Sequence, residues 1–208
     1  IVLFCIFGAF LQHSGAGKFF IDFSMTLMGN KSNAAGRTVV LSSFLLGGPS
    51  GSGVATTVTI GAVAYPMMKK AGYRMDRSAG LIAAGGIIAP VIPPSIGFIL
   101  FGVIGGVSIS KLFLAGIVPG VMMGVALIVT WWLVAHKDKV EVAPKVPMRE
   151  RLRVTADAFW SYLLAFTIIG GMKAGIFTPT EAAVVAVVYS LLVGLFVYRE
   201  IKFNQLYA

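Results

Sequence analysis

Long uncharged stretches separated by short basic segments make up the hydrophobic pattern of this chain. Thr38–Met68 is one such stretch of 31 residues, with a glycine- and serine-rich centre at Gly47–Gly53. As one straight helix it would reach roughly 47 Å at about 1.5 Å per residue, against a hydrocarbon core of about 30 Å. It is too short for two full crossings, and the basic residues at both of its ends place both ends on the cytoplasmic side. We therefore predict a re-entrant helical hairpin over 38–68.

A second stretch, Ser78–Ser110, runs 33 residues without a charge and contains Pro90, Pro93 and Pro94. Each proline lacks an N–H and obstructs the helical bond to the carbonyl four residues earlier. The prolines thus leave three carbonyls without helical partners, those of Gly86, Ala89 and Pro90. We predict a proline-broken helix over 78–104.

The rest of the chain predicts more helices and no strands. Residues 1–11 resemble the tail of a transmembrane helix, and 19–28 an interfacial helix with Phe20, Phe23 and Leu27 on its apolar face. An ordinary span follows over 112–135, with Trp131 and Trp132 placed as in an aromatic belt. A basic linker over 136–153 precedes two more spans, roughly 155–175 and 180–198. The predicted fold class is therefore an all-α integral membrane protein.

Composition and charge support this prediction. The chain is 57% hydrophobic and 12% charged, with a formal net charge of +9. The predicted topology places all but Lys111 and Lys173 of its 17 lysines and arginines on one side of the membrane, as the positive-inside rule expects. This distribution argues for a lipid bilayer as partner and against nucleic acid. Cys5 is the single cysteine, and no P-loop, zinc-protease or Ser/His/Asp pattern indicates an enzyme.

The hairpin tip is the first candidate for chemistry. Ser52 is placed to cap the returning helix, whose N-terminal N–H groups carry partial positive charge and suit a carboxylate. Tip carbonyls and hydroxyls, with those of the following threonines such as Thr56, are hard oxygen ligands for a small cation. The alternative is a kink or a packing interface of small residues.

The proline break is the second candidate. A dehydrated cation is one way to satisfy its unpaired carbonyls, and Ser95 is placed to cap the second half-helix. Alone, a proline-kinked helix with no ligand explains this segment better. Two breaks in adjacent elements, however, form the discontinuous-helix pattern of secondary transporters. Glu181 has a structural interpretation, because Thr178-Pro179-Thr180-Glu181 matches a helix capping box.

The motifs Ser50-Gly51-Ser52-Gly53-Val54-Ala55-Thr56 and Ile92-Pro93-Pro94-Ser95 resemble the large membrane subunit of tripartite ATP-independent periplasmic (TRAP) transporters, the DctM-like permeases. The similarity extends through 66–73, 110–120 and 175–183, in order over nearly the whole chain. The resemblance implies sodium-coupled import of a small organic acid, a carboxylate or sugar acid, by an elevator mechanism in the bacterial cytoplasmic membrane. It also implies two partners, a periplasmic substrate-binding protein and a small four-helix membrane subunit, and no cofactor other than the coupling ion Na⁺.

The same resemblance implies the site residues. Sodium is expected at Ser50, Gly51 and Ser52 of the tip and at Gly86, Ala89, Pro90 and Pro93 of the break. The substrate is expected near Thr56, Pro94 and Ser95. Residues 1–135 would then form the transport region of one repeat, 136–153 a cytoplasmic linker and 154–208 scaffold helices.

Only one hairpin and one broken helix occur in the sequence, whereas the family has two inverted repeats. The chain also opens in the middle of an apolar run, so we expect a piece of a longer protein that does not transport alone. Two other functions stay open. One is a stand-alone sodium/dicarboxylate symporter or antiporter of similar fold, and the other is a non-transporting membrane scaffold.

Overall fold

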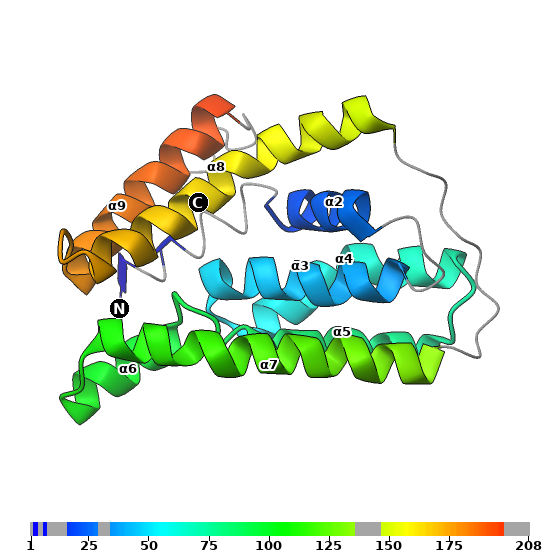
Figure 1. Cartoon of the computed structure of the whole chain (residues 1–208), viewed down its shortest axis with the longest axis horizontal. Helices are drawn as coiled ribbons and strands as arrows, with labels where there is room; N and C mark the ends of the chain where they lie inside the picture. Colours follow the sequence, from blue (N-terminus) through cyan, green and yellow to red (C-terminus); the bar gives the residue numbers. More distant parts are fainter. Residues whose placement is uncertain (1, 4–5, 8–15, 29–33, 136–146, 198–208) are drawn as a thin grey trace.

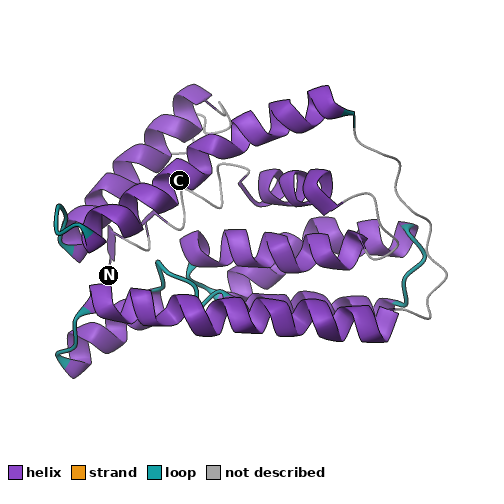
Figure 2. Ribbon diagram, viewed as in Figure 1, coloured by secondary structure: helices purple, strands orange, loops and turns teal. Residues whose placement is uncertain are grey.

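The computed structural model describes residues 2–3, 6–7, 16–28, 34–135 and 147–197, and within them every regular element is a helix (Figures 1 and 2). An all-α fold is therefore confirmed for the described part of the chain. The elements, in order, are α2 (Ala16–Met28), α3 (Ala34–Ser50), α4 (Gly53–Lys70), α5 (Met75–Ile88), α6 (Ile96–Gly105), α7 (Ile109–Ala135), α8 (Met148–Lys173), α9 (Pro179–Leu192) and the π-helix η1 (Val193–Val197).

Helix α3 is the centre of the fold. It packs against α2, α4, α5 and α7, and Figure 1 shows it lying along α7 with α2 on its other side. Val39, Val40 and Leu46 of α3 are almost completely buried, as are Ile60 and Met68 of α4. Glycine, serine and threonine occupy many of the remaining buried positions of α3, which allows neighbouring backbones to approach closely.

Two helical segments of the described residues are long and apolar enough to cross a membrane: α7, and α9 continued by η1. They match the spans predicted over 112–135 and 180–198. Large apolar side chains of α6 and α7 point outward, among them Ile104, Val118 and Met122. Such an exposed apolar surface is typical of contact with lipid or another protein. The span predicted over 155–175 lies in α8 and stays a prediction.

The face predicted for the interfacial helix is wrong. Phe20 and Phe23 are buried as expected, but Leu27 is exposed, and Ser24 and Thr26, which lie outside the predicted apolar face, are buried. The reason is that α2 packs against α3, α4 and α8 and so buries more than one face. The Ser42 hydroxyl of α3 donates to the Phe20 carbonyl at 3.3 Å, which fixes the two helices against each other.

Part of the predicted basic linker is helical. Helix α8 begins at Met148, so residues 148–153 continue the helix that contains the next apolar segment. Its basic residues Arg149, Arg151 and Arg153 are compatible with a helix, since arginine is a good helix former. The other part of the linker, 136–146, and most of the predicted tail over 1–11 lie outside the described residues.

Candidate functional site

The turn of the hairpin is a two-residue connection between α3 and α4. Gly51 adopts φ of +59°, a left-handed conformation that glycine takes without steric cost. Ser52 follows as the N-cap of α4, and its hydroxyl accepts a hydrogen bond from the Ala55 N–H at 3.3 Å. The Ser50 hydroxyl donates to the Ser52 carbonyl at 3.3 Å. The predicted helical hairpin and its Ser52 cap are therefore confirmed, whereas its re-entrant position in a membrane stays a prediction.

The proline break separates α5 from α6 as predicted, but Ser95 does not cap α6 with its side chain. Ser95 occupies the N-cap position, while its hydroxyl donates to the Pro90 carbonyl at 2.6 Å. Pro94 lies four residues after Pro90 and has no N–H to offer that carbonyl, so the Ser95 hydroxyl takes this place. The first N–H groups of α6 consequently have no side-chain cap.

The three carbonyls predicted to lack helical partners have different surroundings. The Gly86 carbonyl accepts the Ala89 N–H at 3.1 Å in a tight turn, and the Pro90 carbonyl accepts the Ser95 hydroxyl. The Ala89 carbonyl has no hydrogen-bond donor among the described residues. Because a carbonyl oxygen has two lone pairs, all three still have capacity for a ligand.

The structure brings the hairpin turn and the proline break together. A Cβ atom added to any of four hairpin glycines would lie about 3 Å or less from the broken helix. The distances are 2.9 Å from Gly47 to the Ala89 Cα, 2.7 Å from Gly48 to the Pro93 carbonyl oxygen, 3.1 Å from Gly51 to the Ile96 nitrogen and 3.0 Å from Gly53 to the Gly86 carbonyl oxygen. Glycine is thus required for this backbone-to-backbone packing. We call this region, 47–53 with 86–96, the junction.

Two helix N-termini meet at the junction. Helix α4 begins at Gly53 and α6 at Ile96, whose nitrogen lies against Gly51. Neither helix has an acidic residue in its first turn. The partial positive charge of both N-termini is therefore not neutralised by the helices themselves and favours an anion. Carbonyl and hydroxyl oxygens beside them favour a small hard cation.

Most of the predicted site residues lie at the junction. Ser50 and Ser95 are buried, as are Pro93 and Pro94, whose shared peptide bond is cis, while Pro90 is exposed. Thr56 lies one turn into α4, is fully buried, and has no hydrogen-bond partner for its hydroxyl among the described residues. That Thr56 contacts the substrate stays a prediction.

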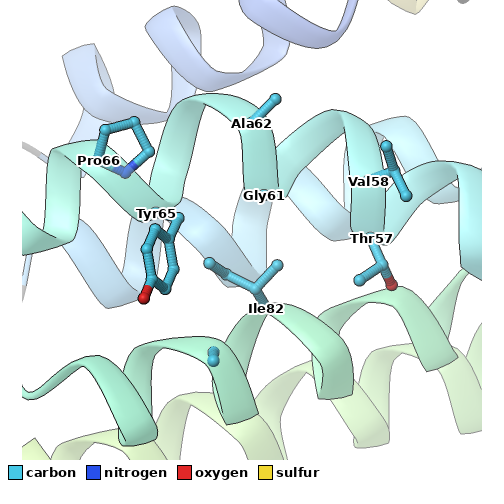
Figure 3. Close-up of a pocket in the computed structure, with 8 residues that line it drawn as sticks. Thr57, Val58, Gly61, Ala62, Tyr65, Pro66 and Ile82 are labelled. Carbon is cyan, nitrogen blue, oxygen red and sulfur yellow. The ribbon is translucent and has the colours of Figure 1, made fainter.

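An open groove between α4 and α5 leads to the junction. Figure 3 shows Pro66 and Tyr65 toward one end and Thr57 and Val58 toward the other. The volume of the groove is about 490 Å³. A second hollow of about 420 Å³ shares Thr57 and Val58 and reaches Gly53, Gly86 and Pro90.

Thr57 follows the hairpin tip in the sequence, but only its neighbour Thr56 was predicted to be a site residue. Its hydroxyl donates to the Gly53 carbonyl at 2.8 Å and lies where a Cβ of Gly86 would be. Thr56 and Thr57 are adjacent in the sequence, and which of the two faces α5 depends on how α4 is rotated in the packed fold. From the sequence alone, one can predict only that one of these two adjacent threonines faces the broken helix.

Uncharged, discontinuous helices whose breaks pack together, beside apolar spans, define this chain as part of a helical membrane protein. The family model of the DctM component of the tripartite ATP-independent periplasmic transporter matches residues 1–208. The chain belongs to this family, which confirms the predicted resemblance and identifies it as TRAP large-permease sequence.

Several curated relatives agree with this assignment. The chain is 45% identical over 207 residues to the 2,3-diketo-L-gulonate TRAP transporter large permease protein YiaN of Escherichia coli K12, covering 100% of the chain and 49% of the relative. It is 38% identical to the C4-dicarboxylate large permease DctM of Pseudomonas aeruginosa (99% and 48% covered). It is 35% identical to the sialic acid permease SiaT of Haemophilus influenzae (100% and 34% covered). The chain thus spans half or less of the length of these relatives.

Proposed function

We propose that this chain forms one part of a permease that imports a small organic acid into a bacterial cell by sodium-driven symport. The observation that carries the proposal is the meeting of two uncapped or partly capped helix N-termini, α4 and α6, at the junction. Two N-termini aimed at one place favour a carboxylate. The names of three relatives, which refer to diketogulonate, C4-dicarboxylate and sialic acid, agree with an acidic substrate.

Sodium would bind at the oxygen atoms of the same junction. Ser50, Gly51 and Ser52 would contribute from the turn, and the carbonyls of Gly86, Ala89, Pro90 and Pro93 from the break. The free Ala89 carbonyl supports this role, because an unpaired carbonyl within a membrane is costly unless a ligand occupies it. A cation bound there would add positive charge beside the two N-termini and so strengthen the binding of an anionic substrate, which would couple the two binding events.

The substrate would contact Thr56, Pro94 and Ser95, and the present arrangement adds Thr57 at the mouth of the groove. Because Thr56 is fully buried here, its contact with substrate would require α4 to shift relative to its neighbours. We propose this local shift in addition to the elevator mechanism with re-entrant hairpins that the whole protein would use. The α4–α5 groove is open on one side, which gives α4 room for the movement.

The complete transporter would include a periplasmic substrate-binding protein, a small four-helix membrane subunit and the remaining half of the permease. We propose that residues 1–208 alone do not transport. The relatives that this chain matches are about twice as long or longer, and the junction contains only one hairpin and one broken helix.

The deciding experiment is uptake of a labelled organic acid by the full-length permease with its small subunit in proteoliposomes. Uptake is measured with and without an inward sodium gradient, and with and without the binding protein. We expect uptake only when the sodium gradient and the binding protein are both present. Uptake by the isolated 208-residue fragment would contradict the proposal that it is incomplete.

The other outcomes identify the alternatives. Sodium-driven uptake that needs no binding protein would favour a stand-alone symporter, and uptake driven by counterflow of a second solute would favour an antiporter. No uptake under any gradient, with a folded protein, would favour a membrane scaffold in which the junction serves only packing.

A further inference from the structure

Buried polar atoms without partners concentrate at one place in this structure. Six buried side-chain oxygen or nitrogen atoms lack a hydrogen-bond partner among the described residues. Two of them belong to Ser43, in the middle of α3, and to Thr56 of α4. The other four lie on or beside the first two turns of α3, or belong to helices packed there: Ser24 Oγ, Arg37 Nε, Thr38 Oγ1 and Trp131 Nε1.

Trp131 of α7 is aimed at the first turn of α3. The side chain is only 3% exposed, so it does not belong to an aromatic belt as predicted. Its Nε1 lies beside Gly36, where a Cβ would overlap it, and its ring packs against Tyr73 at a centroid distance of 5.3 Å. Indole nitrogen is a donor only, and a buried donor without an acceptor is costly. Trp131 therefore requires an acceptor at the start of α3.

Ser24 and Thr38 lie at the same level of the α2–α3 pair. The two helices run in opposite directions, and the Ser42 hydroxyl contacts the Phe20 carbonyl. Thr38 lies one turn before Ser42 in α3, and Ser24 lies one turn after Phe20 in α2. Because the helices are antiparallel, Thr38 and Ser24 are at the same level. Both hydroxyls are fully buried and unpartnered. The start of α3 thus has hydroxyl groups on the α2 side and an indole N–H on the α7 side.

The charge at this end of the bundle favours an anion. Arg37 has a buried Nε without an acceptor, and the first turn of α3 contains no acidic residue and begins with N–H groups that lack helical partners. Figure 1 shows that α3 and α5 begin, and α4 and α7 end, at the same end of the bundle. Lys69 and Lys70 also lie there. Of the described carboxylates, Asp76 is engaged by Arg74 at 2.7 Å, and Asp22 of the neighbouring α2 also has an interaction partner.

An apolar hollow lies next to Trp131. It has a volume of about 200 Å³ between α5 and α7 and is lined in part by Leu81, Ala84, Leu127 and the Trp131 ring. Arg77 lies at its end and donates to the Val134 carbonyl at 2.8 Å. A hollow that is apolar along its length and basic at its end suits the acyl chain and headgroup of a phospholipid.

We propose that the first turn of α3 binds a phosphate group, held by Arg37, the Trp131 indole N–H and the backbone N–H groups of that turn. The phosphate supplies the acceptors that these buried donors lack. It belongs either to a phospholipid, whose acyl chain would occupy the α5–α7 hollow, or to a free phosphate ion. This site lies at the opposite end of α3 from the junction, so it is independent of the proposed sodium and substrate sites.

The test is thermal unfolding of the full-length permease in detergent, titrated with phosphatidylglycerol, with phosphatidylcholine or with inorganic phosphate. We expect phosphatidylglycerol to raise the unfolding temperature. Trp131→Phe removes the N–H but keeps an aromatic ring, and Arg37→Gln removes the charge. Each should raise the half-saturating lipid concentration about tenfold, the effect of losing one hydrogen bond to a charged group. Two matched controls change exposed residues nearby, Trp132→Phe and Lys70→Gln. Each control should change the half-saturating lipid concentration less than about twofold.

Each outcome has a defined meaning. Stabilisation by phosphatidylglycerol alone assigns a lipid, and equal stabilisation by inorganic phosphate in phosphatidylcholine assigns a free ion; both support the site. No stabilisation by either probe overturns it. Equal losses in Lys70→Gln and Arg37→Gln would also overturn it, because binding would then be a property of the whole basic surface. If Trp131→Phe does not fold, the comparison of the half-saturating lipid concentrations of Arg37→Gln and Lys70→Gln tests the site.

Discussion

Helices α4 and α9 are both capped by a side-chain hydroxyl, of Ser52 and Thr178, but only α9 has a carboxylate at its N-terminus. In α9, the Thr178 hydroxyl accepts from the Glu181 N–H at 3.3 Å, and the Glu181 carboxylate accepts from the Thr178 N–H at 2.8 Å. In α4, the Ser52 hydroxyl accepts from the Ala55 N–H, and alanine stands where α9 has its carboxylate. The capping box predicted at Glu181 is confirmed.

The difference separates a structural helix start from one that is available to a ligand. The N-terminus of α9 is neutralised by its own side chain and needs nothing from outside. The N-terminus of α4 keeps its partial positive charge, and α6, whose Ser95 hydroxyl is directed to the Pro90 carbonyl, adds a second one. The N-termini of α4 and α6, which carry no acidic residue, thus lie at the junction where transport is proposed, whereas the N-terminus of α9 is closed by its own side chain.

The largest expected effect comes from separating the two halves of the junction. Gly86→Ala adds a Cβ that would overlap the Thr57 hydroxyl and lie 2.7 Å from the Gly53 carbonyl oxygen. We expect uptake by the full-length permease to fall to background. Gly80→Ala is the matched control in the same helix, because no atom lies within 4 Å of its Cβ. It should keep full uptake and gain up to about 1 kcal/mol of stability. Normal uptake by Gly86→Ala would mean that close packing is dispensable.

The next prediction makes α4 resemble α9. Ala55→Glu completes a capping box with Ser52, so the new carboxylate occupies the N-terminus of α4, where the carboxylate of the substrate is proposed to bind. We expect up to about 30-fold weaker acid uptake, corresponding to about 2 kcal/mol, without loss of thermal stability. Ala55→Gln can form the same box without charge and should retain more uptake. Equal uptake by the two variants would argue against an electrostatic role for this N-terminus.

Removing the cap of α4 should have a smaller effect. Ser52→Ala deletes the acceptor of the Ala55 N–H and one proposed sodium ligand. We expect about 1 kcal/mol lower stability and a half-saturating sodium concentration raised about fivefold, as measured by the sodium dependence of initial uptake. A loss of stability with unchanged sodium dependence would support the scaffold alternative.

The corresponding change in α9 should affect stability only. Thr178→Ala removes the hydroxyl that accepts the Glu181 N–H and should also cost about 1 kcal/mol, since it deletes the same kind of cap. The half-saturating sodium concentration should equal that of the unmodified permease. A sodium shift as large as that of Ser52→Ala would show that the two N-termini are not functionally different.

The smallest expected effect concerns a third helix start, that of α5. The hydrogen bonds from Arg74 and then from the Arg77 backbone lower the pKa of Asp76 below its ordinary value of 3.8. A carboxylate with a lowered folded-state pKa stabilises the fold above its unfolded pKa and loses this contribution as the pH falls through the folded value. Asp76→Asn should therefore lower the unfolding temperature slightly at pH 7, and less below pH 3.8. Equal differences at both pH values would contradict the ion pair.

Much of the fold could be predicted from residue order alone. Charge-free stretches with a central glycine turn or three prolines leave few arrangements for the backbone, so the hairpin and the break were predicted to within a few residues. The Ser52 and Thr178 caps were also predictable, because capping depends on residues within one turn. By contrast, the Ser95 cap was wrong, since a carbonyl freed by Pro94 competes for the same hydroxyl.

Long-range packing decided the rest. The sequence marks α2 as apolar on one face, but only contact with α3, α4 and α8 explains why Ser24 and Thr26 are buried. It also marks Trp131 and Trp132 alike, whereas the fold buries the first against Gly36 and exposes the second.

The sequence by itself determined where this chain must leave the helix and that α4 and α9 are capped, because those constraints act between residues less than two turns apart. Only the tertiary structure decided that the two breaks meet, that Thr57 rather than Thr56 faces the broken helix, and that unpartnered donors gather at the start of α3. These features depend on the rotation and register of packed helices. Rotation and register are set by the sum of many side-chain contacts over the whole interface, and no local pattern contains that sum.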